Sequence, residues 1–421
     1  MTQSGSDHDD QSLSRMSRHS LIGLFLRFLR FGCLAWGGPT AQIEMLKREL
    51  VDAERWVDEA RFRRALSVYQ ALPGPEAHEL CCWFGMNARG RAGAVAAGLG
   101  FMLPGLALML VASWLYVKFG VRDPMVAGAF TAAQAAIVAL VVRASVRLAR
   151  SLAGGPHLGA IALMAAISQP LMVPFWIPLL FGGVANALLH TRLRALAAPT
   201  ILAAIVTVLF IGSLHALPAR LDQTATPSGF AEAAPMRIFA AGLSGGLVSF
   251  GGAYTAIPVV RDEAVGPQGW MSEPQFLDGL AIGGVLPAPL VIFATFVGYL
   301  GGGFVGALLA TLGIFLPAFS FTLIGHRLIE RAVENERLHA FLDGVAASVA
   351  GLIAATSLFL LTAAIGLGPS PSSISVSWQL LRPWSLAIAV VALALLFASK
   401  SRWAVPAVVL GAALFGAIIL R

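Results

Sequence analysis

Paired glycines and paired prolines are the residues of this sequence whose types and spacing indicate chemistry. Two Gly-Gly pairs and two Pro-x-Pro motifs interrupt long apolar segments. Such a break leaves free backbone N–H groups at the start of the following helix, where they and the helix dipole attract oxyanions. The pattern therefore indicates a site for an oxyanion, and such helix starts can hold a tetrahedral dianion without a fixed lysine or arginine. The residues predicted to form it are Gly37, Gly38, Pro39, Thr40, Pro73, Gly74, Pro75, Gly251, Gly252, Tyr254, Thr255, Pro287 and Pro289, with Thr40, Tyr254 and Thr255 as hydroxyl donors.

These motifs occur twice at one constant spacing. Gly37-Gly38, Glu49, Trp56 and the Pro73-Gly74-Pro75 motif recur 214 positions later in the chain. A duplicated membrane unit interrupted by glycine and proline is typical of secondary transporters, whose substrate site lies where the two repeats meet. The same glycines also suit close helix packing or a homodimer interface, and this simpler interpretation stays open for each pair.

Charged residues follow each Gly-Gly pair. Arg48-Glu49 in the first repeat corresponds to Asp262-Glu263 in the second, where Arg261 precedes them. One interpretation is an interfacial segment in which acids and bases pair locally. The other is a gate, in which Arg261 attracts the anion and Glu49 and Glu263 reset the site, because an ionisable group in a membrane is costly unless it has a function. The residues predicted for coupling or gating are Arg48, Glu49, Arg261, Asp262 and Glu263.

The composition places the chain in a lipid bilayer. Hydrophobic residues make up 57% of it, charged residues 12%, and the mean hydropathy is +0.78. These values and the long apolar runs indicate a polytopic helical membrane protein. The net charge of +7 does not indicate nucleic-acid binding, because the basic residues lie between apolar segments, as the positive-inside rule predicts. The three cysteines provide no disulfide framework.

The distribution of basic residues predicts the topology, because positive charges stay in the cytoplasm. Arg15 and Arg18 place the N-terminus in the cytoplasm. Arg337 of the second repeat should face the cytoplasm, together with basic positions 327 and 331, whereas the corresponding Lys118 and Arg122 should face outward. We therefore expect two repeats of inverted topology.

We predict an all-α protein with broken or re-entrant helices and about 13 membrane crossings. Its parts are a disordered polar cytoplasmic tail (1–19), a first repeat (20–216), a non-cytoplasmic linker (217–235) and a second repeat (236–421). Residues 158–189 are expected to form a hairpin of two short helices. It lies between two cytoplasmic basic clusters, Arg143 with Arg147 and Arg150, and His190 with Arg192 and Arg194.

Three further groups of residues could be read as functional, but a structural role is the simpler interpretation of each. Glu76, His78 and Glu79 resemble metal ligands, but acids in a first helical turn are favoured by the helix dipole, so no metal site is predicted. Cys81-Cys82 is expected to be inert apolar filling rather than a redox pair. Trp56 and Trp270 are expected to anchor segments at the membrane interface.

The ordered motifs resemble those of the chromate ion transporter family. In the first half these are Gly37-Gly38-Pro39, Arg48-Glu49, Trp56 and Leu72-Pro73-Gly74-Pro75, and in the second half they are the runs 249–258, 261–263 and 283–289. The resemblance extends from Leu21 onward and implies a long, two-repeat inner-membrane permease that exports chromate and confers resistance. Ala253 and Ala288 stand where the first repeat has Pro39 and Gly74, so the two halves are not equivalent at the site.

Export of an anion needs no nucleotide, because an inside-negative potential supplies about 2.3 kcal/mol per charge per 100 mV. The chain has no Gly-x-x-x-x-Gly-Lys-[Ser/Thr] loop, and we predict no cofactor and no enzymatic activity. Proton or counter-anion coupling stays open. A general sulfate or oxyanion carrier is the main alternative, since chromate and sulfate share shape and charge. A membrane-embedded enzyme and a scaffold are weaker alternatives, because no catalytic cluster is evident and duplicated helix breaks do not serve a scaffold.

Overall fold

The computed structural model describes residues 20–120, 123–151, 155–171, 173–190, 199–201, 203, 206–208, 233–249, 253–266, 269–333, 335–364, 383–399 and 401–420. Within these residues the fold is entirely helical, as predicted. Several predictions concern residues outside this part of the chain. They are the tail 1–19, most of the linker, Arg122, Arg192, Arg194, Gly251 and Gly252.

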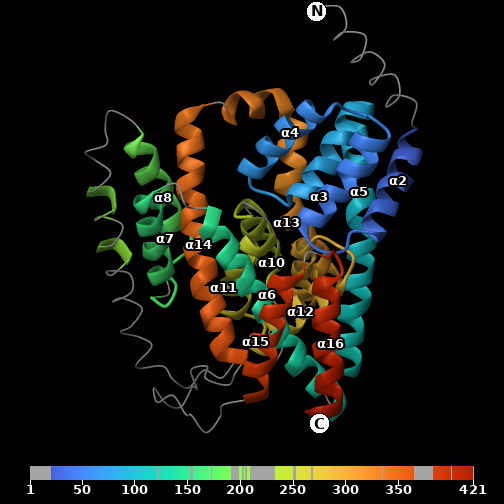
Figure 1. The fold of residues 1–421 in the computed structure, drawn as a ribbon, viewed down its shortest axis with the longest axis vertical. Coiled ribbons are helices and arrows are strands. Elements are labelled where there is room, and N and C mark those ends of the chain that lie inside the picture. The colour runs from blue at the N-terminus through green and yellow to red at the C-terminus, as the bar shows by residue number, and fades with distance from the viewer. Residues whose placement is uncertain are drawn as a thin grey trace, which may run out of the picture.

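The helices of the two repeats follow one another in the same order (Figure 1). The first repeat contains α2 (Leu21–Cys33), α3 (Pro39–Leu46), the π-helix η1 (Lys47–Ala53), α4 (Glu59–Ala71), α5 (Glu76–Phe119), α6 (Pro124–Ser151), α7 (Pro156–Ser168) and α8 (Trp176–Leu189). The second contains α10 (Pro235–Leu247), η4 (Ala253–Thr255), α11 (Ala256–Val265), α12 (Glu273–Val285), η5 (Leu290–Ile292), α13 (Phe293–Val333), α14 (Glu336–Ala364), α15 (Pro383–Ala398) and α16 (Ala404–Ile419).

The longest helix of each repeat is a hairpin rather than one straight rod. In α5 the chain reverses at Gly90 (φ 60°, ψ −152°), and in α13 the corresponding Gly303 has φ 59°. Beyond each turn the two arms pack closely through glycines. A Cβ on Gly85 would lie 2.2 Å from the carbonyl oxygen of Gly93 across the hairpin, and a Cβ on Gly298 would lie 2.3 Å from that of Gly306. Each long helix therefore consists of a short returning arm and a long arm.

The short arms complete re-entrant helix pairs, which the sequence predicted. In the first repeat, α2 packs on α5, and its Arg30 reaches Glu49 of η1 at 3.4 Å. The break at Gly37-Gly38 lies between α2 and α3 and forms the first tip. The next pair is α4 and the short arm of α5, and its tip is the Pro73-Gly74-Pro75 motif. The second repeat has α10 with α11 and α12 with the short arm of α13 at the corresponding positions.

The two repeats run through the molecule in opposite directions. The start of α6 lies against the end of α16, where Gly128 meets the backbone of Gly416 and Leu420, at the end of the molecule marked by the C-terminus. The start of α14, the counterpart of α6, lies at the opposite end, which is also the end where α2 begins on the other side of the molecule (Figure 1). Lys118 and Arg337 thus lie at opposite ends, as inverted topology predicts.

Four stretches are long and apolar enough to cross a membrane: Glu76–Phe119, Pro124–Arg150, Leu290–Ile324 and Glu336–Thr362. Shorter apolar helices include α7, α8, α15 and α16. Because re-entrant pairs enter the bilayer and return, apolar segments outnumber crossings. The predicted number of about 13 crossings stays a prediction.

Two short helices of each repeat pack against the other repeat. Helices α7 and α8, the predicted hairpin at 158–189, pack on α14, while α15 and α16 pack on α6. Glycines bring the backbones together at both places, with Gly182 against Gly344 and Gly416 against Gly128. The first repeat therefore covers α14 of the second, and the second repeat covers α6 of the first.

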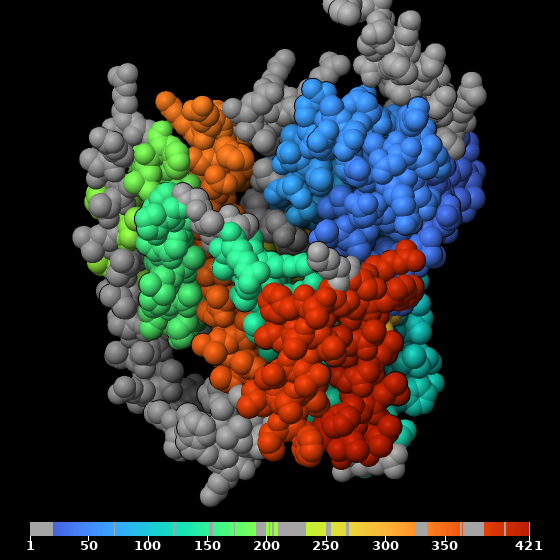
Figure 2. Space-filling view, viewed as in Figure 1, coloured from blue at the N-terminus to red at the C-terminus, as the bar shows by residue number. Residues whose placement is uncertain are grey.

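The two ends of the molecule differ in how they are closed. Helix α12 packs against α6 and α16, and its buried Asp278 accepts hydrogen bonds of 2.7 Å from Tyr116 of α5 and Gln134 of α6. Among the described residues, the counterpart α4 has no comparable packing against α14 or α8. Figure 2 shows the first-repeat helices in blue and the start of α14 in orange at the end of the molecule to which α4 belongs. The structure is therefore docked through α12 at one end, without an equivalent contact of α4 among the described residues at the other.

Candidate functional site

The helix breaks of the two repeats meet inside the molecule. The N–H of Gly74 donates a 2.9 Å hydrogen bond to the carbonyl of Ser249, which precedes the second Gly-Gly pair. A Cβ on Gly38 would lie 3.7 Å from the Tyr254 hydroxyl. Ala288 packs against Gly105 of α5 so closely that a Cβ on the glycine would come within 2.4 Å. The described breaks of the two repeats therefore lie close together, and their role as one anion site stays a prediction.

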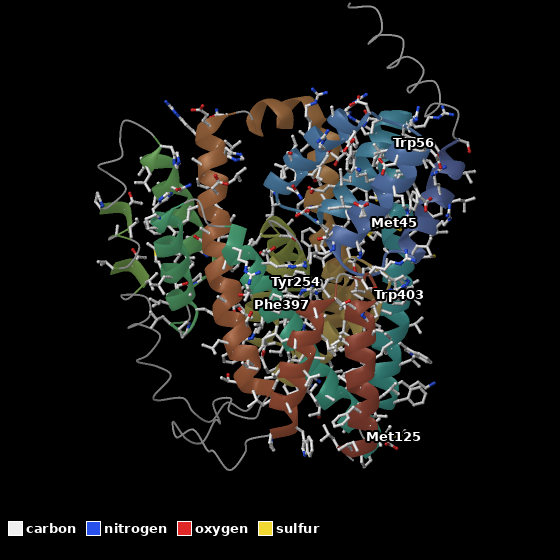
Figure 3. The ribbon with its side chains drawn as sticks, viewed as in Figure 1. Met45, Trp56, Met125, Tyr254, Phe397 and Trp403 are labelled. Carbon is white, nitrogen blue, oxygen red and sulfur yellow. The ribbon has the colours of Figure 1, made fainter. Side chains whose placement is uncertain are left out.

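Tyr254 marks this convergence near mid-height of the molecule. Figure 3 places it between the level of Trp56, near the N-terminal end, and that of Met125, near the C-terminal end. Its side chain is half-buried, and Thr255 beside it is buried. Thr40, the hydroxyl donor predicted in the first repeat, is exposed.

The first tip has the backbone that an anion site at a helix start requires. Gly37 and Gly38 have φ of 92° and 80°, and Pro39 begins α3. Gly38 is the N-cap of α3 and provides no side-chain oxygen for the first N–H groups of the helix. The tip is held from outside by the segment before α16, where Trp403 lies 5.1 Å from Trp36, measured between ring centroids.

The Pro-x-Pro tips differ in the charge that follows them. Pro289 precedes η5, which contains only Leu290, Val291 and Ile292. Pro75 precedes α5, whose first turn contains the buried acids Glu76 and Glu79. Both carboxyl oxygens of Glu79 are buried and have no hydrogen-bond partner among the described residues. The first-repeat Pro-x-Pro tip therefore offers an anion a less favourable helix start than the Gly37-Gly38 tip does.

Arg143 and Arg147 of α6, which the sequence analysis assigned to topology, lie four residues apart on one side of the helix. Arg147 is exposed and Arg143 is half-buried. Their topological role stays a prediction.

The residues predicted as a gate lie along helices that lead away from the tips. Glu49 pairs with Arg30, and Arg48 is exposed. Arg261 makes a two-pronged pair with Glu273 at 2.9 and 2.7 Å, lies 3.3 Å from Asp262, and covers the ring of Phe359 at 4.0 Å. Glu263 is half-buried. These local pairs match the first interpretation, and the gating role stays a prediction.

No metal site is apparent near the tips. The described residues contain no group of three or more His, Cys, Asp or Glu side chains arranged for a metal ion. His78 lies between the rings of Phe315 and Phe319, with centroids 4.9 and 4.7 Å away, and its Nδ1 is 3.8 Å from the Cys82 sulfur. Cys81 and Cys82 are buried free thiols.

The expected interfacial role of the two tryptophans is wrong. Trp56 is 2% exposed and Trp270 5% exposed, so neither reaches the lipid headgroups. Each indole N–H instead donates within the protein, that of Trp56 to Glu54 at 2.9 Å and that of Trp270 to the carbonyl of Val297 at 3.0 Å. They fix the ends of the re-entrant pairs.

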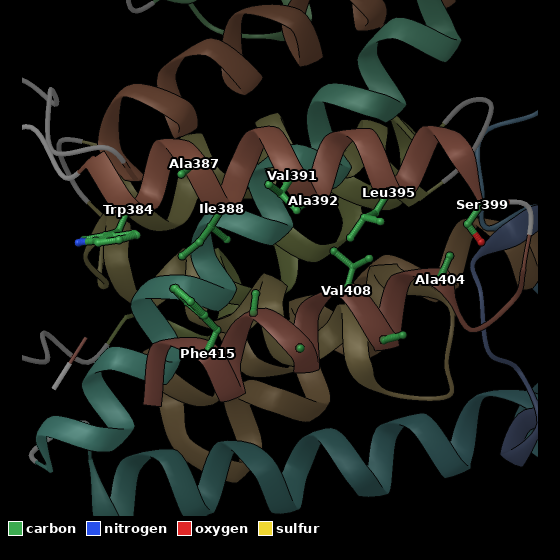
Figure 4. A pocket seen from close by; sticks show the side chains of 13 residues that line it. Trp384, Ala387, Ile388, Val391, Ala392, Leu395, Ser399, Ala404, Val408 and Phe415 are labelled. Carbon is green, nitrogen blue, oxygen red and sulfur yellow. The ribbon is translucent and has the colours of Figure 1, made fainter. Parts of the chain in front are cut away.

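A cavity of about 550 Å³ between α15 and α16 is separate from the tips (Figure 4). Its lining is apolar except for Ser399, and includes Trp384, Ile388, Val391 and Phe415. Such a lining provides almost no donors for an oxyanion, whose desolvation would go uncompensated there. The cavity is therefore not the anion site.

Comparisons with known proteins give one consistent result. The family model described as "Chromate transporter" matches residues 22–218 and 236–417, which correspond to the two repeats. The chain is 49% identical to the "Chromate transport protein" of Pseudomonas aeruginosa over 94% of this chain and 92% of that protein. It is 28% identical to the protein of the same name from Cupriavidus metallidurans over 95% and 93%, respectively. No solved structure matches the chain.

Proposed function

The chain belongs to the chromate transporter family, and from this we propose that it exports chromate across the bacterial inner membrane and so confers chromate resistance. It acts as a secondary transporter rather than as an enzyme. The observation that carries the proposal is the convergence of helix breaks from two inverted repeats, with Gly74 bonded to Ser249 and Gly38 facing Tyr254.

In this proposal chromate binds at the repeat interface. Backbone N–H groups at the start of α3 point toward its oxygens, and Tyr254 and Thr255 add hydroxyl donors. Gly251 and Gly252 contribute the corresponding helix start of the second repeat. The gate residues, among them Glu49 and Arg261, exchange their local partners as the site changes its exposure.

The distribution of charge supports export as the direction. Exposed arginines are concentrated at the end of the molecule where α2 begins, namely Arg55, Arg63, Arg64, Arg91 and Arg337. Lys118 and Arg237 are the basic side chains that the described residues place at the other end. The positive-inside rule then makes the α2 end cytoplasmic, with the N-terminus inside. At this end α4 is not docked on α14 among the described residues, so the conformation suits loading from the cytoplasm.

The membrane potential supplies the driving force. Moving a dianion outward across an inside-negative membrane releases about 4.6 kcal/mol per 100 mV, twice the value for one charge. Proton or counter-anion coupling adds to this but is not required.

Transport into inside-out vesicles tests the proposal. Vesicles that contain the protein should take up labelled chromate when the potential is set positive inside the vesicle, with the pH gradient set separately. Protein-free vesicles from the same cells provide the control. No uptake under either gradient by folded protein would overturn the proposal. Full inhibition by equimolar sulfate would replace it with the general oxyanion carrier.

A further inference from the structure

We propose that Glu79 of α5 is a proton-binding residue whose protonation controls anion binding at the Pro73-Gly74-Pro75 tip. The proton neutralises the carboxyl group while a dianion occupies the interface of the two repeats, and loss of the proton repels the dianion. This proposal rests on the proposed function. It adds a proton as a second ligand that is bound together with the anion.

The first argument is the position of Glu79 directly behind the tip. A Cβ on Gly74 would lie 2.6 Å from Oε1 of Glu79 and 3.2 Å from its Oε2, so the carboxyl group faces the backbone of the tip. The N–H of Gly74 in turn donates a 2.9 Å hydrogen bond to the carbonyl of Ser249 in the other repeat. A single glycine therefore separates the carboxyl group from the interface where the anion is proposed to bind.

The second argument is that the carboxyl group of Glu79 has no donor and no cation beside it. Glu79 is 0% exposed, and neither of its carboxyl oxygens has a hydrogen-bond partner among the described residues. No described basic side chain forms an ion pair with it. A carboxylate buried in this way is costly, and such a group takes up a proton instead. We therefore expect Glu79 to be protonated in this conformation.

The ionisable neighbours of Glu79 on its own helix offer it no positive charge. Glu76 lies one turn earlier on the same side of α5 and is 6% exposed. His78 lies between two phenylalanine rings of α13, and its Nε2 is buried without a hydrogen-bond partner among the described residues, so a charged imidazole is unfavourable there. Cys82, one turn later, is a buried thiol.

The helices packed on α5 provide no cation either. Arg27 of α2 pairs with Glu54, and Arg61 of α4 donates to Asn87 at 2.8 Å. Tyr69 of α4 is a buried phenol, which is uncharged near neutral pH. Asp278 of α12 is held by two hydrogen bonds, and α13 has no charged residue between positions 293 and 324. The remaining charged residues of α2, α3, α4 and α12 are exposed or paired, namely Arg30, Glu44, Glu59, Arg63, Arg64 and Glu273.

Proton and anion therefore favour each other's binding. An ionised Glu79 would repel a dianion on the other side of the tip, and this repulsion is strong where water is excluded. Protonation removes the charge that makes this tip less favourable than the Gly37-Gly38 tip. By linkage, the proton strengthens anion binding by the same factor by which the anion strengthens proton binding. Affinity should be highest where Glu79 is protonated, and it should fall as the pH rises and the carboxyl group ionises.

A purely structural role for Glu79 predicts a different result. A buried glutamate that only fills space can be replaced by the isosteric glutamine with no effect on the pH dependence of anion binding. Glu76→Gln is the matched control, because it removes an acid of the same helical turn that does not face Gly74. The pH profile therefore separates a proton-binding role from packing.

Equilibrium binding of labelled chromate to the purified full-length protein tests the proposal. Affinity would be measured between about pH 6 and pH 9.5, a range that covers the titration of buried glutamates in proteins, with thermal unfolding as the folding control. Chromate itself takes up a proton at mildly acidic pH, so each profile is compared with that of Glu79→Gln. We expect the affinity of the parent and of Glu76→Gln to fall about tenfold more than that of Glu79→Gln, which corresponds to a difference of one pKa unit. Equal profiles for the parent and Glu79→Gln would overturn the proposal.

Proton uptake by the parent protein is an independent measurement that needs no variant. At alkaline pH, where chromate carries no proton, chromate binding in weakly buffered solution should take up close to one proton per anion. Glu79→Asp, which keeps the carboxyl group, should retain this uptake, and Glu79→Gln should lose it. Binding by the parent without proton uptake across the alkaline range would contradict the proposal. A parent protein that neither binds nor transports chromate would instead refute the proposed function.

Discussion

Gly37 and Gly38 are adjacent residues with similar backbone angles but different surroundings. Both have positive φ, so an alanine at either position is strained by about 1–3 kcal/mol. At Gly37 the new methyl group would also lie 2.6 Å from the carbonyl oxygen of Arg402, whereas at Gly38 the nearest atom is the Tyr254 hydroxyl at 3.7 Å. Only the first position combines strain with a collision against backbone.

We therefore predict different defects for the two alanine variants. Gly37→Ala should displace the segment before α16 and lower the thermal midpoint of the purified protein more than Gly38→Ala does. Gly38→Ala should fold but place a methyl group between the start of α3 and Tyr254, and so weaken chromate binding. Thermal unfolding and binding of labelled chromate check this. Equal midpoints for both variants, or parent-like binding by Gly38→Ala, would contradict the expected site geometry.

At this scale the sequence indicated the helix breaks but not their neighbours. The breaks were identifiable because glycine and proline have local backbone effects that do not depend on the fold. The contacts between the breaks, such as the hydrogen bond of Gly74 to Ser249, were not identifiable, because they depend on how distant segments pack. The anion-binding role of these residues stays a prediction.

Among the elements, the two helical hairpins are the closest structural counterparts in the repeats. Their turns at Gly90 and Gly303 have φ of 60° and 59°, and a Cβ at either position meets no atom within 4 Å. A substitution there changes backbone strain without creating a collision. Substitutions at Gly90 and Gly303 therefore both measure backbone strain at a hairpin turn, one in each repeat.

We predict that Gly90→Ala and Gly303→Ala destabilise the protein by similar amounts, about 1–3 kcal/mol each. Gly159 of α7 is the matched control, because it also has open space around it but no positive φ. Gly159→Ala should be neutral or stabilising, since alanine favours helix over glycine by about 1 kcal/mol. Thermal unfolding in one detergent checks all three. A Gly90→Ala variant as stable as the parent would mean that the hairpin turn of α5 can form without a positive φ at position 90.

The repeat also shows how far sequence alignment predicts elements. The spacing of 214 holds through the first Pro-x-Pro motif, but Gly90 and Gly303 are 213 positions apart. One residue is therefore lost in the second repeat between the tip and the hairpin turn, where the short 3₁₀ helix η5 replaces the first turn of α5. The hairpins themselves were not predicted, because each long apolar run resembles a single crossing until its internal glycine is known to have positive φ.

In the whole molecule, inverted repeats should exchange their conformations during transport. Here α12 is docked on α6, while α4 is not comparably docked on α14 among the described residues. Opening to the other side would require α12 to leave α6 while α4 docks on α14. The hydrogen bonds of Asp278 to Tyr116 and Gln134 would break in that step.

A reversible cross-link between α12 and α6 should therefore stop transport. Gln134 and Pro274 are suitable positions, because the Gln134 amide lies 3.3 Å from the Pro274 carbonyl at the exposed edge of this contact. In a Cys33→Ser background, Gln134→Cys with Pro274→Cys should lose at least 90% of chromate transport after treatment with a short bifunctional thiosulfonate, and recover it with reductant. Each single-cysteine variant, treated in the same way, is the control. Full transport by the cross-linked protein would show that this contact does not open.

The mutual covering of α6 and α14 by the terminal helices of the opposite repeat has a consequence for biogenesis. During synthesis, α6 enters the membrane long before α15 and α16 exist, so its face of small residues at Gly128 and Ala132 meets lipid until the last helix has been made. The first repeat is then a folding intermediate rather than an independent half. A nascent chain that stops before Pro383 would present that face permanently, and membrane quality-control proteases would be expected to recognise it.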